Sequence, residues 1–236
     1  MKRLIFLVIV GLTTIIACGQ KKEIRTVPAF TGINAKNLFD ITVTKGSNES
    51  LTVEAIDEVM PYVRSEVLDG VLHLYIDNPN MNGYRGAEIK KLRAFIVMNN
   101  LEEVTLSGIT KLTSKDLFTP DSFKCDISGI SKMEINVNTG QLNVKMYGIG
   151  KVKMDAEVTG NAELDLSGIS KIKGKLTAES VYINSRGGSR IKLKGETGVL
   201  HTLNEAKTSN APLIKYKHRR RMSIYPHGSD RFTKIK

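Results

Sequence analysis

The sequence predicts an all-β protein, a β-solenoid with about 20 residues per coil. Five segments resemble one another at a regular spacing, and polar and apolar residues alternate within each of them. The 236 residues also include 20 glycines, 6 prolines and many short runs rich in Val, Ile and Leu, which is typical of strands joined by tight turns. The two cysteines exclude a disulfide scaffold and a Cys-rich zinc module.

Residues 1–17 have the pattern of a lipoprotein signal peptide. Met1–Arg3 is basic, and Leu4–Ile16 is an uncharged run of 13 residues, too short to cross ~30 Å of hydrocarbon as a helix. Ile15–Cys18 resembles a bacterial lipobox, in which the cysteine becomes the acylated first residue. We therefore expect an exported protein held in the outer membrane by lipid on Cys18, with residues 18–23 as a linker and the membrane face left open.

The formal charge of +11 is unevenly distributed. Removal of residues 1–17 lowers it to +9, and residues 201–236 carry nine Lys and Arg against two acids, which leaves only +2 for residues 18–200. The body of the protein is thus close to neutral, and its C-terminal tail is basic.

The repeat consists of five similar segments that each contain a glycine. They are Thr105–Leu112, Asp126–Met133, Lys145–Val152, Asp165–Ile172 and Asn184–Ile191. Their first glycines, Gly108, Gly129, Gly148, Gly168 and Gly187, are 21, 19, 20 and 19 residues apart. A unit this short cannot bury its own apolar face, so stacked coils paired at ~4.8 Å are expected. A β-sandwich is the alternative, but its strands do not repeat at the level of residues.

Equivalent positions in the five segments predict which side chains face the core. The inward positions before the glycine are Val104, Cys125, Val144, Leu164 and Ile183, then Leu106, Ile127, Met146, Leu166 and Ser185. The polar positions between them, Thr105, Asp126, Lys145, Asp165 and Asn184, are expected to face water. After the glycine, we expect Ile109, Ile130, Ile149 and Ile169 to return to the inside, followed by Leu112, Met133, Val152, Ile172 and Ile191. The glycine itself is expected at a bend where φ is positive.

The rest of the chain is organised around this repeat. Residues 24–200 form the expected β-helix domain, with regular coils in 99–200 and an atypical part in 24–98 that covers the open end. Strands are expected there at Phe39–Thr44, Leu51–Ala55, Tyr62–Leu68, Leu72–Ile76 and Arg93–Met98. Asp69-Gly70 is a strong hairpin turn signal. Residues 201–236 are interpreted as an irregular last coil and a basic tail.

Several of these features together resemble the putative auto-transporter adhesin, head GIN domain family of Bacteroidetes envelope proteins. They are the lipobox, Phe30-Thr31-Gly32-Ile33, Phe39-Asp40-Ile41-Thr42-Val43, the turn in Val67–Leu72 and the Ser-Gly-Ile-Ser-Lys corners. The resemblance covers about residues 24–200. It implies a right-handed, single-stranded parallel β-helix, exported and often lipid-anchored, and it supplies no catalytic residues. The tail after Leu200 does not match the family pattern.

Two basic groups are candidate binding residues. The corner column Lys111, Lys132, Lys151, Lys171 and Arg190 is either a stripe for an anionic ligand or a solvated row partly neutralised by nearby acids. The tail group Lys215, Lys217, Arg219, Arg220 and Arg221 either contacts anionic lipid or phosphate-bearing polysaccharide, or serves solubility. Export argues against nucleic acid as a partner.

Catalysis and cofactors are not predicted. Asp126 and Asp165 are two coils apart with Lys145 between them, and the four histidines are scattered. No metal-ligating spacing occurs, and Cys125 reads as a core residue, whereas Tyr147 is expected to face outward. The sequence therefore favours a non-catalytic envelope lipoprotein that binds a surface, an anionic glycan or an envelope protein. The alternatives are a periplasmic structural or self-associating scaffold and, less favoured, a polysaccharide-active enzyme; homo-oligomerisation stays open.

Overall fold

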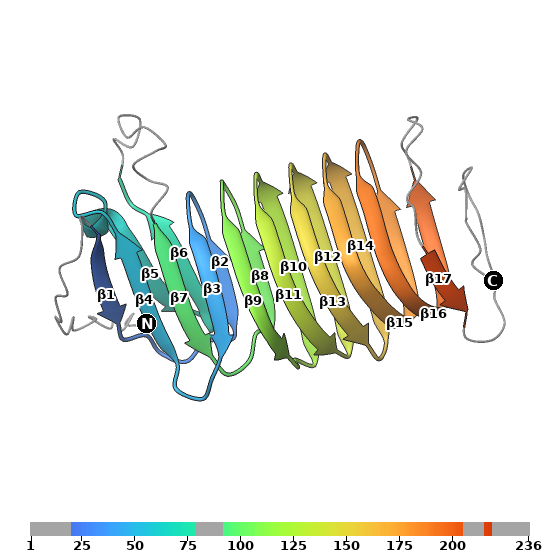
Figure 1. The fold of residues 1–236 in the computed structure, drawn as a ribbon, viewed down its shortest axis with the longest axis horizontal. Helices are drawn as coiled ribbons and strands as arrows, with labels where there is room; N and C mark the ends of the chain where they lie inside the picture. Colours follow the sequence, from blue (N-terminus) through green and yellow to red (C-terminus); the bar gives the residue numbers. More distant parts are fainter. Residues whose placement is uncertain (1–19, 79–91, 205–214, 219–236) are drawn as a thin grey trace, which may run out of the picture.

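The computed structural model describes residues 20–78, 92–204 and 215–218. These residues form a parallel β-solenoid of about 5 turns with ~20 residues per coil, which confirms the predicted fold. Figure 1 shows the coils stacked along one axis, with β1 (Lys21–Arg25) at one end and β16 (Arg190–Asn204) and β17 (Lys215–His218) at the other. The only helix in the described part is a single 3-10 turn at Met60–Tyr62.

The solenoid has two faces, each a continuous row of hydrogen-bonded strands. The first face is, in spatial order, β5 (Val63–Leu68), β6 (Val71–Ile76), β2 (Gly32–Ala35), β8 (Glu103–Leu106), β10 (Ser122–Gly129), β12 (Gln141–Gly148), β14 (Asn161–Gly168) and the C-terminal parts of β15 (Lys171–Ser185) and β16. The second face is β1, β4 (Ser50–Ala55), β7 (Arg93–Met98), β3 (Asp40–Lys45), β9 (Lys111–Phe118), β11 (Lys132–Thr139), β13 (Lys151–Val158), the N-terminal parts of β15 and β16, and β17. Only β1–β4, β4–β7 and β5–β6 pair antiparallel.

The core lies between the two faces and is built from the predicted inward columns. Val104, Cys125, Val144, Leu164 and Ile183 are all buried and lie in parallel register. The column that starts at Leu106 is buried in the same way, and so is the column that starts at Leu112. Each coil hides one apolar stripe from each face, so the alternation along a strand becomes a continuous core along the axis.

The N-terminal part contributes both a coil and a cover. β2 and β3 stack directly on β8 and β9, with Gly32 opposite Glu103 and Asp40 opposite Lys111. The chain then forms β4, β5 and β6, and the β6–β7 coil packs on the other side of β2 and β3. The predicted hairpin at Asp69-Gly70 is confirmed: both residues have positive φ, 51° and 76°, and Leu68 pairs antiparallel with Val71.

Candidate functional site

The corners that carry the repeated glycines share one local structure. Gly129 has φ of 71°, and a Cβ at this position would lie 2.5 Å from the carbonyl oxygen of Gly108 on the preceding coil. That oxygen accepts a hydrogen bond of 2.7 Å from the backbone N–H of Ile130. The hydroxyl of Ser131 points inward and donates to the carbonyl of Ser128 at 2.9 Å. Glycine is required here because a side chain would press on the neighbouring backbone in a strained conformation.

The isoleucines after these glycines lie outside the core, so the prediction that they return to the inside is wrong. The exposed fractions are 55% for Ile109, 51% for Ile130, 53% for Ile149 and 66% for Ile169. The chain needs two residues to turn, which puts the residue after the glycine on the outer side of the bend. The following inward position holds Thr110, Ser131, Gly150, Ser170 and Ser189, small residues that fit a tight corner.

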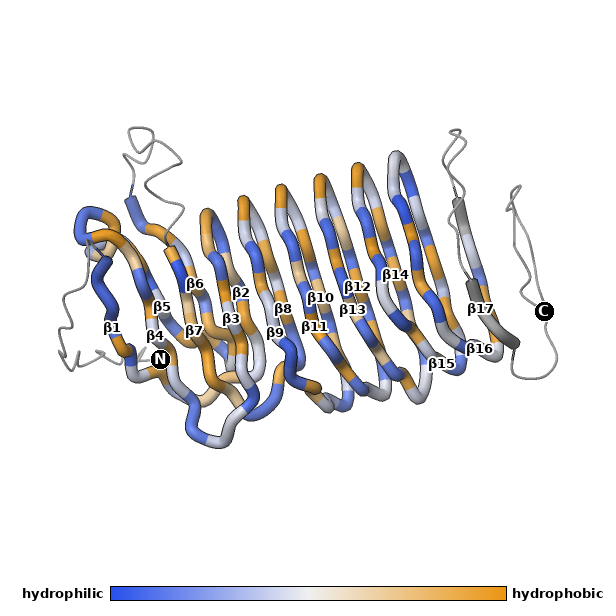
Figure 2. Tube along the Cα trace, in the orientation of Figure 1, coloured by the Kyte–Doolittle hydropathy of each residue, from blue (hydrophilic) through white to orange (hydrophobic). Residues whose placement is uncertain are grey.

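These four isoleucines form one line, which we call the isoleucine edge. The corners that join β8 to β9, β10 to β11, β12 to β13 and β14 to β15 appear in Figure 2 as a row of hydrophobic tips along one side of the solenoid, at the top in that view. The backbone N–H of each isoleucine bonds to the coil before it, at 2.7 to 2.9 Å. Their spacing is therefore the spacing of the coils, about 4.8 Å.

The predicted column of cations lies two residues beyond the isoleucine edge, at the start of each second-face strand. Lys111, Lys132, Lys151, Lys171 and Arg190 are direct register partners, and we call them the basic row. Four of the five are exposed, and Lys171 is half-buried between its neighbours. Burial and the charges of Lys151, Lys192 and Arg190 around it lower the pKa of Lys171.

The same register continues to the N-terminal end of the protein with alternating charge. Lys22 lies opposite Glu54, Glu54 opposite Arg93, Arg93 opposite Asp40, and Asp40 opposite Lys111. Ion pairs join Lys22 and Arg93 to the buried Glu54, and Lys111 to Asp40 at 3.2 Å. Beyond Lys111 the acids stop. Within the described residues, no ion pair involves Lys132, Lys151, Lys171 or Arg190.

The cations extend from the basic row across the second face. The next outward positions on β13, β15 and β16 are Lys153, Lys173 and Lys192, and then Asp155, Lys175 and Lys194. Together with Lys151, Lys171 and Arg190 they make a patch of eight cations around one acid, which we call the basic patch. Asp155 accepts a hydrogen bond from the backbone N–H of Lys175 at 2.8 Å. At the rim, Lys153 pairs with Glu134 at 2.5 Å, which lowers the pKa of Glu134 and raises that of Lys153.

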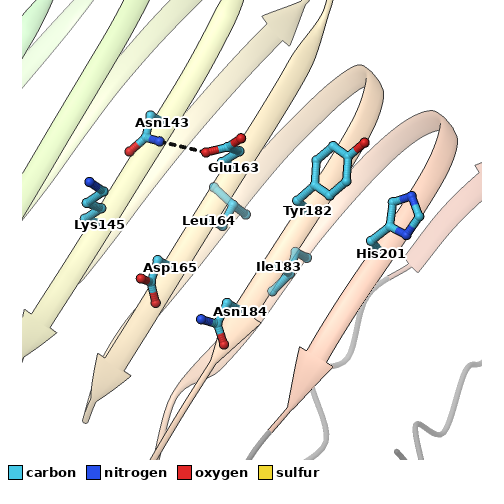
Figure 3. Close-up of a pocket in the computed structure, with 9 residues that line it drawn as sticks. All are labelled: Asn143, Lys145, Glu163, Leu164, Asp165, Tyr182, Ile183, Asn184 and His201. Atoms are coloured by element: carbon cyan, nitrogen blue, oxygen red, sulfur yellow. Dashed lines mark hydrogen bonds between the residues drawn. The ribbon is translucent and has the colours of Figure 1, made fainter. Parts of the chain in front are cut away.

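The first face has a different chemistry. A shallow hollow of about 260 Å³ lies over β12, β14, β15 and β16. Figure 3 shows the side chains that line it, with Lys145 near Glu163 and Asp165. Asn143 donates to Glu163 at 3.0 Å, and the rings of Tyr182 and His201 stack with centroids 4.8 Å apart and planes 5° from parallel. Sequence reasoning missed this aromatic pair, although its spacing of 19 residues is the spacing of the repeat. Charges of both signs line the hollow, so it does not select an anion.

The remaining predicted site residues are distributed as follows. Lys215 and Lys217 belong to β17, whose register places Lys215 opposite Lys194 at the end of the basic patch. Cys18, Arg219, Arg220 and Arg221 lie outside the described residues. Tyr147 is exposed, as predicted, and Cys125 is a core residue whose thiol pKa is raised by burial.

Residues 20–78, 92–204 and 215–218 contain no group of three His, Cys, Asp or Glu side chains placed to hold a metal ion. They also contain no helix of the length and hydrophobicity that crossing a bilayer requires.

Comparison with known proteins gives one family and several solved structures. Residues 29–199 match the sequence model of the family described as "Putative auto-transporter adhesin, head GIN domain". A putative adhesin from Bacteroides fragilis is similar in structure, with a TM-score of 0.61 and 20% identity over 85% of this chain and 97% of that chain. A putative adhesin from Parabacteroides merdae is similar with a TM-score of 0.58 and 15% identity, over 92% of this chain and 96% of that chain. A putative lipid binding protein from Parabacteroides distasonis is similar with a TM-score of 0.54 and 15% identity, over 92% of this chain and 97% of that chain. No curated protein matches the chain.

Proposed function

Because the chain belongs to the putative auto-transporter adhesin, head GIN domain family, we propose that it is a non-catalytic protein of the cell envelope that binds an anionic surface or glycan through its basic patch. The observation that carries this proposal is the change in the charged register at Lys111. Up to that residue each cation faces an acid, and beyond it four successive cations, Lys132 to Arg190, face one another.

Such an arrangement is suited to an extended, multiply charged ligand. Cations recur about every 4.8 Å along the axis and about every 6.6 Å along each strand, the distance between outward side chains. Each contact with an exposed lysine is weak, but contacts to one polymer or one surface add through effective concentration. The hydrogen-bonded ladders keep the cations at fixed spacing, so little order has to be created on binding.

The address of the protein is part of the same proposal. Residues 1–17 act as the signal peptide, and lipid on Cys18 holds the mature chain in the outer membrane. Replacement of Cys18 by serine is expected to move the protein out of the membrane fraction. If an equal share of the Cys18→Ser chain is found in the membrane fraction, the lipid anchor is wrong, but the ligand proposal is unaffected.

Charge reversal tests the basic patch directly. Lys151→Glu with Lys171→Glu places two acids in the basic row, and heparin serves as the acidic polysaccharide probe. We expect binding that weakens with salt in the native chain and falls by on the order of 100-fold in this variant, because two attractive contacts become repulsive.

A matched variant separates the patch from net charge. Lys124→Glu with Lys145→Glu changes the charge by the same amount on exposed first-face strands and should leave heparin binding within about twofold, since the patch is intact. Equal losses in both variants would overturn the proposal. A native chain that ignores polyanions and associates with itself would favour the periplasmic scaffold instead.

A further inference from the structure

The isoleucine edge is an exposed apolar strip whose side chains lie outside the hydrophobic core. Single exposed hydrophobic residues are ordinary on a soluble protein, but here four isoleucines, each more than half exposed, stand on successive coils. They do not stabilise the core, because the inward position of each corner belongs to a small residue. A row of this kind marks a surface that loses contact with water in the working state of the protein.

The residues on either side of the strip restrict what covers it. On the second face the strip is bordered throughout by the basic row. On the first face the bordering positions hold no acid; they are Ser107, Ser128, Tyr147, Ser167 and Arg186. An apolar strip flanked by cations, hydroxyls and a tyrosine has the composition of surfaces that rest in the headgroup region of an anionic bilayer. A soluble polyanion would use the cations and leave the isoleucines in water.

The start of the described chain lies at the same edge. β3 and β7 begin beside the corners, with Asp40 opposite both Lys111 and Arg93. β4 runs antiparallel to β7, and β1 antiparallel to β4, so β1 begins at this edge with Lys21 opposite Ala55. Cys18 precedes Gln20 by two residues, which span at most about 7 Å. The lipid anchor, which rests on the proposed function, would therefore enter a bilayer close to the line of the isoleucine edge.

We propose that the isoleucine edge and the basic row seat the solenoid lengthwise on an anionic phospholipid bilayer. The isoleucines enter the interface between headgroups and acyl chains, and the lysines beside them contact headgroup phosphates. The rod then lies along the membrane, with the basic row next to the bilayer and the first face turned away from it. The hollow beside Tyr182 and His201 stays open to the aqueous side in this orientation.

Vesicle binding of the unlipidated mature chain tests the contact apart from the anchor. The protein is residues 18–236 with Cys18→Ser, which contains every described strand, and the probes are phosphatidylglycerol and phosphatidylcholine vesicles. We expect the protein to bind phosphatidylglycerol vesicles. Ile149→Ser with Ile169→Ser should weaken this binding about 10-fold or more, because the apolar area that these isoleucines bury in the bilayer is removed. The matched control is Leu68→Ser with Leu117→Ser, two exposed leucines at the opposite edge, which should bind as the native chain does.

Orientation gives a second, independent readout. Cys125 is buried, so a cysteine introduced into the Cys18→Ser chain is the accessible thiol among the described residues. A polarity-sensitive fluorophore at Ile149→Cys should shift to the blue on phosphatidylglycerol vesicles, and the same label at Leu117→Cys should not. Equal shifts at both edges, or no shift at either, would refute the lengthwise seating.

The results also separate this inference from the proposed function. Heparin binding should be unchanged in the isoleucine variant, because its basic patch is intact. If the lysine variant loses heparin binding while the isoleucine variant binds vesicles as well as the native chain does, the polyanion proposal stands and the membrane contact is wrong. Binding to lipopolysaccharide alone, with none to phosphatidylglycerol vesicles, would likewise overturn it. If the lysine variant binds heparin as well as the native chain does, the proposed function fails whatever the vesicles show.

Discussion

The corner glycines allow backbone strain and coil-to-coil contact to be measured separately. Gly168 has φ of +80°, and a Cβ there would lie 2.6 Å from the carbonyl oxygen of Gly148 on the preceding coil. Gly70, in the β5–β6 hairpin, has a similar φ of +76° but nothing within 4 Å of its Cβ position. Gly188 has an ordinary φ and its nearest neighbours are at 3.9 Å. Alanine therefore introduces backbone strain and a steric clash at Gly168, backbone strain alone at Gly70, and neither at Gly188.

The expected free energies follow from these differences. A left-handed conformation costs a non-glycine residue roughly 1–2 kcal/mol, and the gain from a stiffer unfolded chain offsets about 0.4–1 kcal/mol of it. Gly70→Ala should therefore lower the free energy of unfolding by about 1 kcal/mol. Gly168→Ala should cost at least about 1 kcal/mol more, because the added methyl group displaces the Gly148 carbonyl that accepts the 2.8 Å hydrogen bond from Ile169. Gly188→Ala should be neutral or stabilise slightly.

Urea unfolding followed by far-UV circular dichroism measures all three variants against the native chain. The decisive quantity is the difference between Gly168→Ala and Gly70→Ala, since the strain they share cancels. Equal destabilisation of these two would show that the neighbouring coil yields without cost. It would refute the conclusion that glycine is needed at the corners for close stacking.

Two further predictions concern ionisable groups. Lys153 lowers the pKa of Glu134 below its ordinary value of 4.5, so the pair stabilises the fold above that pH and the contribution is lost as the pH falls through the folded-state pKa. Lys153→Met should make the free energy of unfolding less dependent on pH in this acidic range, and an unchanged dependence in urea titrations would contradict the pairing. Burial raises the pKa of Cys125, with the charge of Asp126 as a smaller cause, so the thiol should be protonated at pH 8. In the Cys18→Ser chain a thiol reagent should react only at the rate of unfolding, and immediate reaction in the native state would place Cys125 at the surface.

The strands and the core were predictable because both depend on short-range patterns. Period-two alternation identified the inward columns, and the spacing of the glycines set the register between coils, so that Cys125 falls between Val104 and Val144. Once the period is known, each inward position predicts its neighbours above and below. This is why the columns of the core were found from sequence alone.

The isoleucines were misplaced because their hydrophobicity was taken to mean burial. The inward residues on the two sides of this corner, Ile127 and Ser131, are four residues apart, so Ile130 and Lys132 both face water and Ser131 faces the core. The signal that could have found this is the serine, since a polar residue at an inward position needs a nearby backbone acceptor. A corner with a buried serine leaves the isoleucine no inward place.

The charged register of the N-terminal half was beyond the reach of local patterns. Lys22, Asp40, Glu54 and Arg93 are separated by segments of unequal length. In space, β3 lies between β7 and β9, although it precedes both in the sequence. No spacing along the chain shows that Asp40 lies opposite both Arg93 and Lys111. Only the pairing of distant strands reveals that the basic row continues an alternating one.

The contrast between the two halves of this register bears on the origin of the basic patch. Like charges opposite one another on neighbouring strands destabilise a sheet, and opposite charges stabilise it. Glu54 and Asp40 show that acids fit this position of the coil and form ion pairs there. The same coils that carry Lys151 and Lys171 have acids on the first face, at Glu163 and Asp165, so a general excess of basic residues does not explain the patch. Its repulsion is confined to one face and begins where the isoleucine edge runs, which is the arrangement expected if cations and isoleucines act on the same anionic surface.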